Sequence, residues 1–168
     1  MMGMLYAKVI PKQGGGDTLW VNMVELYNQE LSSGMKEMLS KLTAEHSMIK
    51  SHKQSLQHDD NDDNKNNSSL TNHPVICEHG IPKEKYLYVN MSATTKINEL
   101  NEEESNLLLK YLFSLVSKRP DLICRWKWSE NDVCLWHQPT TQHYATANYW
   151  PQHRQMHRCA IMQRTEII

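Results

Sequence analysis

Apolar and polar residues alternate along several stretches of the chain in the two-residue rhythm of β-strands. LYAKVI, residues 5–10, predicts an opening strand that runs into a glycine-rich turn, PKQGGGDT. PVICEHG and KYLYVN predict a strand pair joined by a turn at Gly80 and Pro82. Residues 122–145 alternate around a turn at residues 129–132, and QMHRCAIM predicts one more strand.

Other stretches repeat their apolar residues at helical spacing. LWVNMVELYNQ, residues 19–29, predicts a short helix. Residues 32–42 predict a second helix behind a serine N-cap, with one apolar core face. That face is formed by Met35, Met38, Leu39 and Leu42.

Residues 100–120 carry the strongest helical signal. Asn101 is a suitable N-cap, Glu104 stands at capping-box spacing, and acidic residues fill the first turn. Lys118, Arg119 and Pro120 end the pattern. The predicted buried stripe consists of Leu108, Leu109, Leu112, Phe113 and Val116.

Strands dominate the C-terminal half, the helices come earlier, and no βαβ rhythm repeats. This order favours a mainly β fold with flanking helices (α+β), built on an antiparallel sheet or barrel. Residues 54–73 are polar and low in complexity, with nothing to bury, and predict a surface insertion.

The amino-acid composition argues against several classes of function. The net charge is −1, from 18 basic and 19 acidic residues that do not gather into a basic stripe, which argues against nucleic-acid binding. No apolar run approaches the roughly 18 residues of a membrane span, and the N-terminus does not resemble a signal peptide. We therefore expect a cytoplasmic protein that does not enter membranes. The four scattered cysteines favour reduced, buried thiols over disulfides or a zinc site.

The residues best suited to bind a metal or an anion lie near the C-terminus, where Arg154 and Arg158 follow His143. A neutral imidazole can bind a transition metal, and a guanidinium can pair with both oxygens of a carboxylate. Two arginines four residues apart in a strand share a face, so Arg154 and Arg158 can line one cavity and hold two anions. On spacing alone, the preferred interpretation is that both arginines are surface residues of an edge strand.

Several motifs resemble the taurine dioxygenase (TauD/TfdA) family of Fe(II)- and 2-oxoglutarate-dependent oxygenases. TQHYATANYWPQHRQMHR resembles its C-terminal signature, and GGDTLWVNM its Gly-Gly-Asp-Thr-Leu-Trp segment. LSSGMKEMLSKLTAEH, HPVICEHGIPKEKYLYVNMSATTKINELNEEES and RWKWSENDVCLWHQPTTQHYA are also similar to family segments, in the same order.

The resemblance implies a double-stranded β-helix (jelly roll) and iron held by two histidines and a carboxylate. By position, His143 is the distal histidine ligand and Arg154 binds the distal carboxylate of 2-oxoglutarate, assisted by the Thr18 hydroxyl. Arg158 faces the anionic group of a small substrate. The implied cofactors are Fe(II), 2-oxoglutarate as cosubstrate, and dioxygen. The implied reaction is oxidation of a sulfonate, with taurine to sulfite and aminoacetaldehyde as the model; an aryloxyacetate or alkyl sulfate is the second choice.

The chain also departs from the family pattern. The family's His-x-Asp motif precedes the segment like MGMLYAKVIP, so we expect residues 1–168 to be a single domain that lacks the N-terminal third and two iron ligands. The internal His-x-Asp of His58 and Asp60 lies in the polar stretch, where chance placement explains it better. WHQP, residues 136–139, replaces the usual Trp-Asp-Asn-Arg. Ala93 and Lys96 replace an aromatic residue and an arginine.

Two further hypotheses stay open. The chain can be a catalytically silent homologue that at most binds a dicarboxylate or a partner chain. Alternatively, two copies can complement one another as a homo-oligomer by covering an exposed sheet edge.

Overall fold

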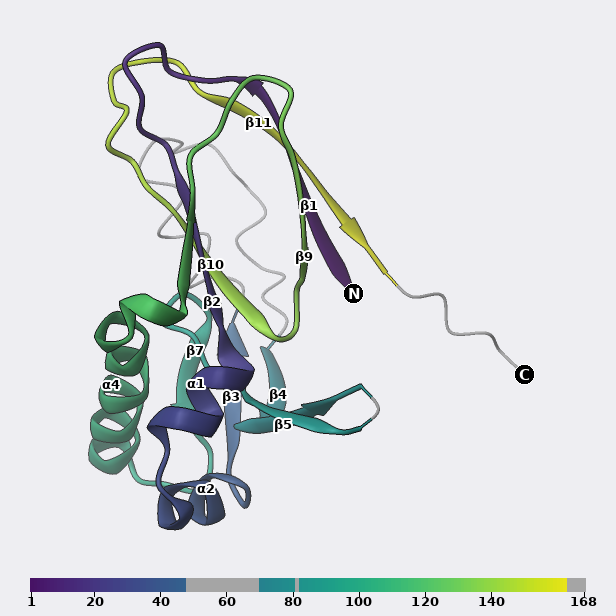
Figure 1. The fold of residues 1–168 in the computed structure, drawn as a ribbon. Helices are drawn as coiled ribbons and strands as arrows, with labels where there is room; N and C mark the ends of the chain where they lie inside the picture. Colours follow the sequence, from purple (N-terminus) through teal and green to yellow (C-terminus); the bar gives the residue numbers. More distant parts are fainter. Residues whose placement is uncertain (48–69, 81, 163–168) are drawn as a thin grey trace. The chain divides into compact units, whose positions relative to one another are not determined.

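The computed structural model describes residues 1–47, 70–80 and 82–162 (Figure 1). The chain forms two compact units. Met1–Met23 and Asp121–Ile168 make up the first, called the terminal unit below, and Val24–Pro120 make up the second, called the central unit. The terminal unit is therefore assembled from the two ends of the sequence, and it contains all four predicted site residues.

Two three-stranded antiparallel sheets form the terminal unit. One has the strand order β11-β1-β9 and the other β10-β2-β8. A 3-10 helix, η1, leads into β8. The bounds are β1 Met2–Val9, β2 Thr18–Asn22, η1 Pro120–Leu122, β8 Ile123–Trp126, β9 Val133–His137, β10 Thr141–Ala145 and β11 Gln155–Ile161.

Tryptophans fill the core of the terminal unit. Trp20 from β2 contacts Trp136 from β9 and Trp128 from the segment after β8, with ring centroids 5.6 and 6.1 Å apart. These three rings and Ala7 of β1 are buried together, so residues of both sheets share one core. Aromatic rings bury large areas, and edge-to-face contacts add to that stabilisation. Gly3 lies against the Trp136 ring, where a Cβ would clash.

The described residues of the central unit combine short sheets with the helices α1, α2 and α4. β3 lies between β4 and β7 in one antiparallel sheet, and β5 and β6 form a hairpin. α4 packs against β7, and the Ser105 hydroxyl accepts a hydrogen bond from the Ile97 backbone N–H at 2.8 Å. The bounds are α1 Met23–Glu30, α2 Ser33–Leu39, β3 Thr43–Ser47, β4 Leu70–Pro74, β5 Ile76–His79, β6 Glu84–Leu87, β7 Thr94–Ile97 and α4 Glu102–Lys118.

α4 begins as the sequence predicts. The Asn101 side chain accepts from the Glu104 backbone N–H at 3.0 Å, and the Glu104 carboxylate accepts from the Asn101 N–H at 3.1 Å. The capping box is therefore complete. The buried stripe is shifted from the predicted one: Leu109 and Leu112 are buried as expected, but Ser105 and Leu115 complete the face.

Several other local predictions were wrong. Residues 19–22, expected to begin a helix, belong to β2, because β8 and β10 pair with this strand on both sides. Met38 is 42% exposed and not core, whereas Leu39 and Leu42 of the same predicted face are buried. Residues 70–73 belong to β4, although the polar insertion was expected to reach residue 73; the rest of that insertion lies outside the described residues.

Other predictions hold. The described pairings are antiparallel, which confirms the mainly β class with flanking helices. All four cysteines are free as expected, but Cys124 and Cys159 are exposed, which corrects their expected burial. Among the described residues, no helix has the length and apolar character to cross a bilayer.

Candidate functional site

Arg154 carries buried hydrogen-bond donors that have no acceptor among the described residues. Its Nε and Nη2 are shielded from solvent and bond to nothing in the described part of the chain. Together they form one edge of the planar guanidinium, the edge that pairs with both oxygens of a carboxylate. Burial lowers the pKa of Arg154, while the neighbouring Tyr149 and Asp17 raise it. A bound anion would satisfy these donors and offset the cost of burying the charge.

Gly16 and Tyr149 fix the position of the Arg154 side chain. A Cβ on Gly16 would lie 2.5 Å from Arg154 Cδ and 2.6 Å from Nε, so only glycine leaves room there. Gly16 also has φ +72°, a conformation that other residues rarely adopt. The Arg154 Cζ lies 5.7 Å from the centre of the Tyr149 ring, within cation–π range. The guanidinium is therefore held before any ligand arrives.

The loop that carries Tyr149 is bonded to the segment that carries Gly16. Asn148 Oδ1 accepts from the Gly16 N–H at 3.1 Å. The Asp17 carbonyl accepts from the Thr146 N–H at 2.9 Å and from the Thr146 hydroxyl at 3.2 Å. The buried Asp17 carboxylate accepts from Arg125 Nε at 2.7 Å. The two segments, over a hundred residues apart in sequence, act as one wall around Arg154.

Thr18 follows this segment at the start of β2 and is fully buried. Its Oγ1 accepts a hydrogen bond from the Trp128 indole N–H at 2.9 Å. A hydroxyl has one hydrogen to donate besides its lone pairs. Since Trp128 occupies a lone pair, the Thr18 hydrogen can point to another acceptor.

His143 lies in the middle of β10, directly opposite Trp20 of β2. Its ring contacts Trp136 of the other sheet, with centroids 5.1 Å apart, so the side chain points to the inner face. The residue is exposed, yet nearby protein atoms partly desolvate its ring. This desolvation, and then the charge of Arg158, lower the pKa of His143. The neutral imidazole, which keeps a lone pair for a metal, is thereby favoured.

Arg158 lies within β11 opposite Leu5 of β1. Leu5 packs against the tryptophan core, so Arg158 shares the inner face of its sheet. Its charge acts on His143, and the structure thus brings these two predicted residues into one neighbourhood.

Arg154 and Arg158 do not lie in one strand, contrary to the prediction from the sequence. Arg154 precedes β11, which begins at Gln155, and the pairing of β1 with β11 shifts register between Ala7 and Val9. Strand alternation therefore does not set the direction of Arg154; Gly16 and Tyr149 do. Sequence reasoning missed these two residues and Asn148. Three consecutive glycines ahead of Asp17 were the available signal.

Metal donors are incomplete in the described part of the chain. Residues 1–47, 70–80 and 82–162 contain no group of three His, Cys, Asp or Glu side chains that could hold a metal ion. His143 is one donor. His58 and Asp60, the internal His-x-Asp, lie outside the described residues.

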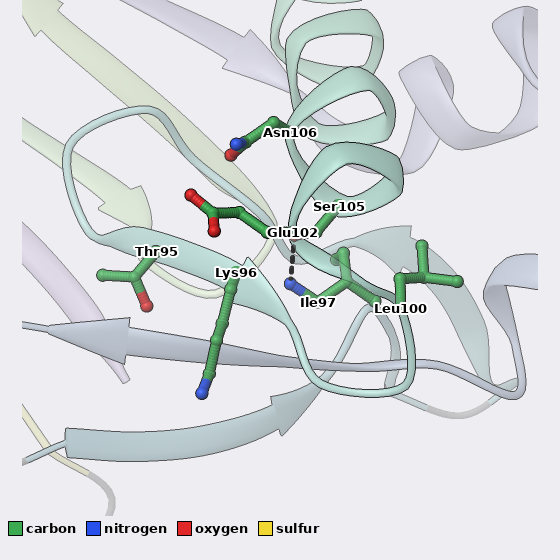
Figure 2. A pocket seen from close by; sticks show the side chains of 7 residues that line it. All are labelled: Thr95, Lys96, Ile97, Leu100, Glu102, Ser105 and Asn106. Atoms are coloured by element: carbon green, nitrogen blue, oxygen red, sulfur yellow. Dashed lines mark hydrogen bonds between the residues drawn. The ribbon is translucent and has the colours of Figure 1, made fainter.

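A separate hollow of about 360 Å³ lies between α4 and β7 in the central unit (Figure 2). Figure 2 shows that Lys96 and Glu102 on its rim point away from one another. Lys96 instead pairs with Glu45 at 3.5 Å. None of the predicted site residues lines this hollow, and its polar groups do not converge as those of a ligand site do.

Two curated relatives are each 36% identical to the chain. One is the alpha-ketoglutarate-dependent dioxygenase cnsP of Penicillium expansum, over 83% of this chain and 37% of its own length. The other is the alpha-ketoglutarate-dependent sulfonate dioxygenase of Saccharomyces cerevisiae, over 84% and 34%. The chain thus spans about a third of the length of these relatives.

Solved structures agree over 94% of the chain. A putative alpha-ketoglutarate-dependent taurine dioxygenase from Burkholderia xenovorans matches with TM-score 0.77 and 28% identity, over 52% of its own length. AAD-2, solved with Mn(II) and N-oxalylglycine, matches with TM-score 0.80 and 25% identity, over 61% of its length. These neighbours confirm the jelly-roll expectation.

The family model described as taurine catabolism dioxygenase TauD, TfdA family matches residues 1–160, which include both units and all four candidate site residues. The chain therefore belongs to the TauD, TfdA family of alpha-ketoglutarate-dependent (2-oxoglutarate-dependent) dioxygenases.

Proposed function

We propose that this chain forms the anion-binding side of an Fe(II)- and 2-oxoglutarate-dependent dioxygenase site that oxidises a small anionic substrate. One observation carries the proposal: the buried Nε and Nη2 edge of Arg154 has no acceptor in the described part of the chain. Buried charged donors are paired in stable sites, and a carboxylate has the matching geometry. We further propose that both units are parts of one domain, because the family match runs across both.

In this proposal Arg154 binds the distal carboxylate of 2-oxoglutarate through two parallel hydrogen bonds. The Thr18 hydroxyl, which already accepts from Trp128, donates its hydrogen to the same end of the dianion. Gly16 and Tyr149 hold the guanidinium in place, so little side-chain entropy is lost on binding. These residues orient the cosubstrate and exclude water from its distal end.

His143 is the proposed metal ligand of this chain. Its lowered pKa favours the neutral ring, which fits the role. Ferrous iron, when bound, supplies the activation of dioxygen and the oxidative decarboxylation of 2-oxoglutarate. Because the described residues supply one donor where a stable site needs three, they do not complete an iron site, and we derive no step through the metal.

Arg158 is the proposed contact for the anionic group of the substrate. Its place on the inner face of β11 and its effect on His143 support that role. A sulfonate is the first choice for this group, supported by the similarity to the yeast sulfonate dioxygenase. An alkyl sulfate or aryloxyacetate is the second choice. A guanidinium fork binds tetrahedral and planar anions alike, so Arg158 selects charge and not one particular compound.

The test measures binding and turnover separately. Calorimetry with purified chain and 2-oxoglutarate gives the dissociation constant, and succinate formation with Fe(II), ascorbate and taurine gives activity. Arg154→Ala should weaken 2-oxoglutarate binding at least about tenfold, because it removes a charge-assisted pair. Arg158→Ala serves as the matched arginine control and should leave that dissociation constant unchanged.

The outcomes separate the hypotheses. Arg154-dependent binding with turnover supports the dioxygenase. Arg154-dependent binding without turnover supports the alternative of a silent homologue that binds a dicarboxylate. Equal binding by wild type and Arg154→Ala would overturn the site assignment. The mass of the same sample over a range of concentrations tests whether two chains associate.

A further inference from the structure

Trp20 carries the second unusual donor of the terminal unit. The residue is 7% exposed, and its indole Nε1 has no hydrogen-bond partner in the described part of the chain. The other two core tryptophans are satisfied: Trp128 donates to Thr18 at 2.9 Å and Trp136 donates to Gln138 at 2.8 Å. Buried donors without acceptors are costly and rare, so the one on Trp20 needs an explanation.

The strand register places Trp20 in line with the proposed site. Trp20 and Thr18 are two residues apart on β2 and therefore share a face. His143 stands directly opposite Trp20, on the same face, across the β2 and β10 pair. Both rings contact Trp136 of the other sheet, at 5.6 and 5.1 Å, which identifies this face as the interior.

Thr18 and Trp20 thus follow one another along the interior of β2, with His143 level with Trp20. Arg154 packs on Gly16, two residues before Thr18. The donors in this row are the Arg154 edge, the Thr18 hydroxyl and the Trp20 indole. A row of hydrogen-bond donors suits a ligand that has oxygen acceptors at both ends and no hydrogen-bond donors of its own.

We propose that the Trp20 indole N–H donates a hydrogen bond to the 2-oxo acid end of a bound 2-oxo dicarboxylate, and so is a further positioning residue for the cosubstrate. The proposal rests on the function proposed above. Arg154 and Thr18 hold the distal carboxylate, and Trp20, level with His143, orients the opposite end. The bond satisfies the buried indole only when the ligand is present.

Proton–nitrogen correlation spectra of the ¹⁵N-labelled chain test this directly. The chain has five tryptophans, so the indole region is simple, and Trp20→Phe assigns the Trp20 signal by its loss. Titration with 2-oxoglutarate alone should move the Trp20 indole proton downfield. The signal of Trp150, which is 77% exposed, should stay in place.

Calorimetry provides the second readout. Trp20→Phe keeps an aromatic ring and removes the N–H, and it should weaken 2-oxoglutarate binding roughly tenfold, as expected for one hydrogen bond to a charged group. Trp136→Phe is the matched control. It makes the same change in the same core, but the lost N–H bonds to Gln138, so the dissociation constant should not change.

These experiments distinguish a failure of the role proposed for Trp20 from a failure of the proposed function. If 2-oxoglutarate binds in an Arg154-dependent way while the Trp20 signal stays still and Trp20→Phe binds as well as wild type, the role of Trp20 is overturned and the proposed function stands. If the folded wild type binds no 2-oxoglutarate, both are overturned. If Trp20→Phe fails to fold, the wild-type titration, with its signals assigned through the backbone, still decides.

Discussion

Gly16 and Arg154 are packed so closely that residue 16 must be glycine for the Arg154 side chain to keep its position. A Cβ at residue 16 would lie 2.5 Å from Arg154 Cδ, and the backbone there has φ +72°. The absence of a side chain at one end of the sequence thereby positions a guanidinium near the other end.

Gly16→Ala should weaken 2-oxoglutarate binding about tenfold or more, because the methyl group displaces Arg154 from its carboxylate-binding position. Gly14→Ala is the matched control. Gly14 has φ +86° but no atom within 4 Å of its would-be Cβ, so it adds the backbone strain without the clash. Calorimetry of both variants checks this; equal loss of affinity in both would show that strain, and not displacement of Arg154, is the cause.

Thr18→Val should lower the free energy of unfolding by about 1–3 kcal/mol, because it leaves the Trp128 indole N–H buried without an acceptor. Trp128 is only 4% exposed. Thr18→Ser keeps the hydroxyl and should lose much less. Urea unfolding followed by tryptophan fluorescence compares the two. A valine variant as stable as wild type would contradict the assigned bond.

His46 should make the chain less stable in acid. The ring is buried in the central unit, its Nδ1 lies 3.3 Å from Thr94 Oγ1, and its centroid is 5.5 Å from that of His73. Burial, and then His73, lower the pKa of His46 below its ordinary 6.5. The unfolded chain therefore binds this proton more readily than the folded chain does. The stabilisation is complete above about pH 6.5 and declines as the pH falls below it, by at most about 1.4 kcal/mol per pH unit.

Urea unfolding at several pH values measures this slope. His46→Phe retains a ring and cannot titrate, so its stability should fall less steeply below pH 6.5 than that of wild type. His153→Gln removes an exposed histidine of the terminal unit and serves as the control. Identical slopes for wild type and His46→Phe would refute the assignment. Tyr88, which also contacts His46, stays neutral in this range because burial and Cys77 raise its pKa.

Asn101→Ala should lower the free energy of unfolding by about 1 kcal/mol, since it removes the N-cap of α4. Asn106→Ala, at an exposed position inside the same helix, should instead leave stability unchanged or raise it slightly, because alanine is the better helix former. Chemical denaturation of the pair checks the opposite signs. A similar loss in both variants would mean that the capping box contributes little.

The sequence predictions were accurate where neighbouring residues determine the structure, and they failed where distant residues do. α4 was predicted to within a residue at its start, because Asn101 and Glu104 lie within one turn of it. Residues 19–22 were misassigned because their pairing partners in β8 and β10 lie about a hundred residues or more away. Met38 was placed in the core because the apolar spacing continues past Leu39, where the helix ends.

The same limit applies to the site. Arg154, Arg158, His143 and Thr18 came from family resemblance, and their roles stay predictions. Strand spacing alone gave a wrong reason for the direction of Arg154, which lies before β11. The contact between Gly16 and Asn148 joins residues 132 positions apart in the sequence. No local sequence pattern can predict such a contact.

The split of the terminal unit between the two ends of the sequence sets an order for folding during synthesis. Residues 24–120 form the central unit as one continuous stretch, so its contacts need none of the later strands. β1 and β2 emerge earlier, but the described strands with which they pair, β8 to β11, follow only after the central unit. Such distant pairing is slow and leaves apolar strands uncovered while it is pending. The wall around Arg154, which needs Gly16 from the beginning of the chain and Tyr149 from near its end, is consequently among the last parts of the molecule to form.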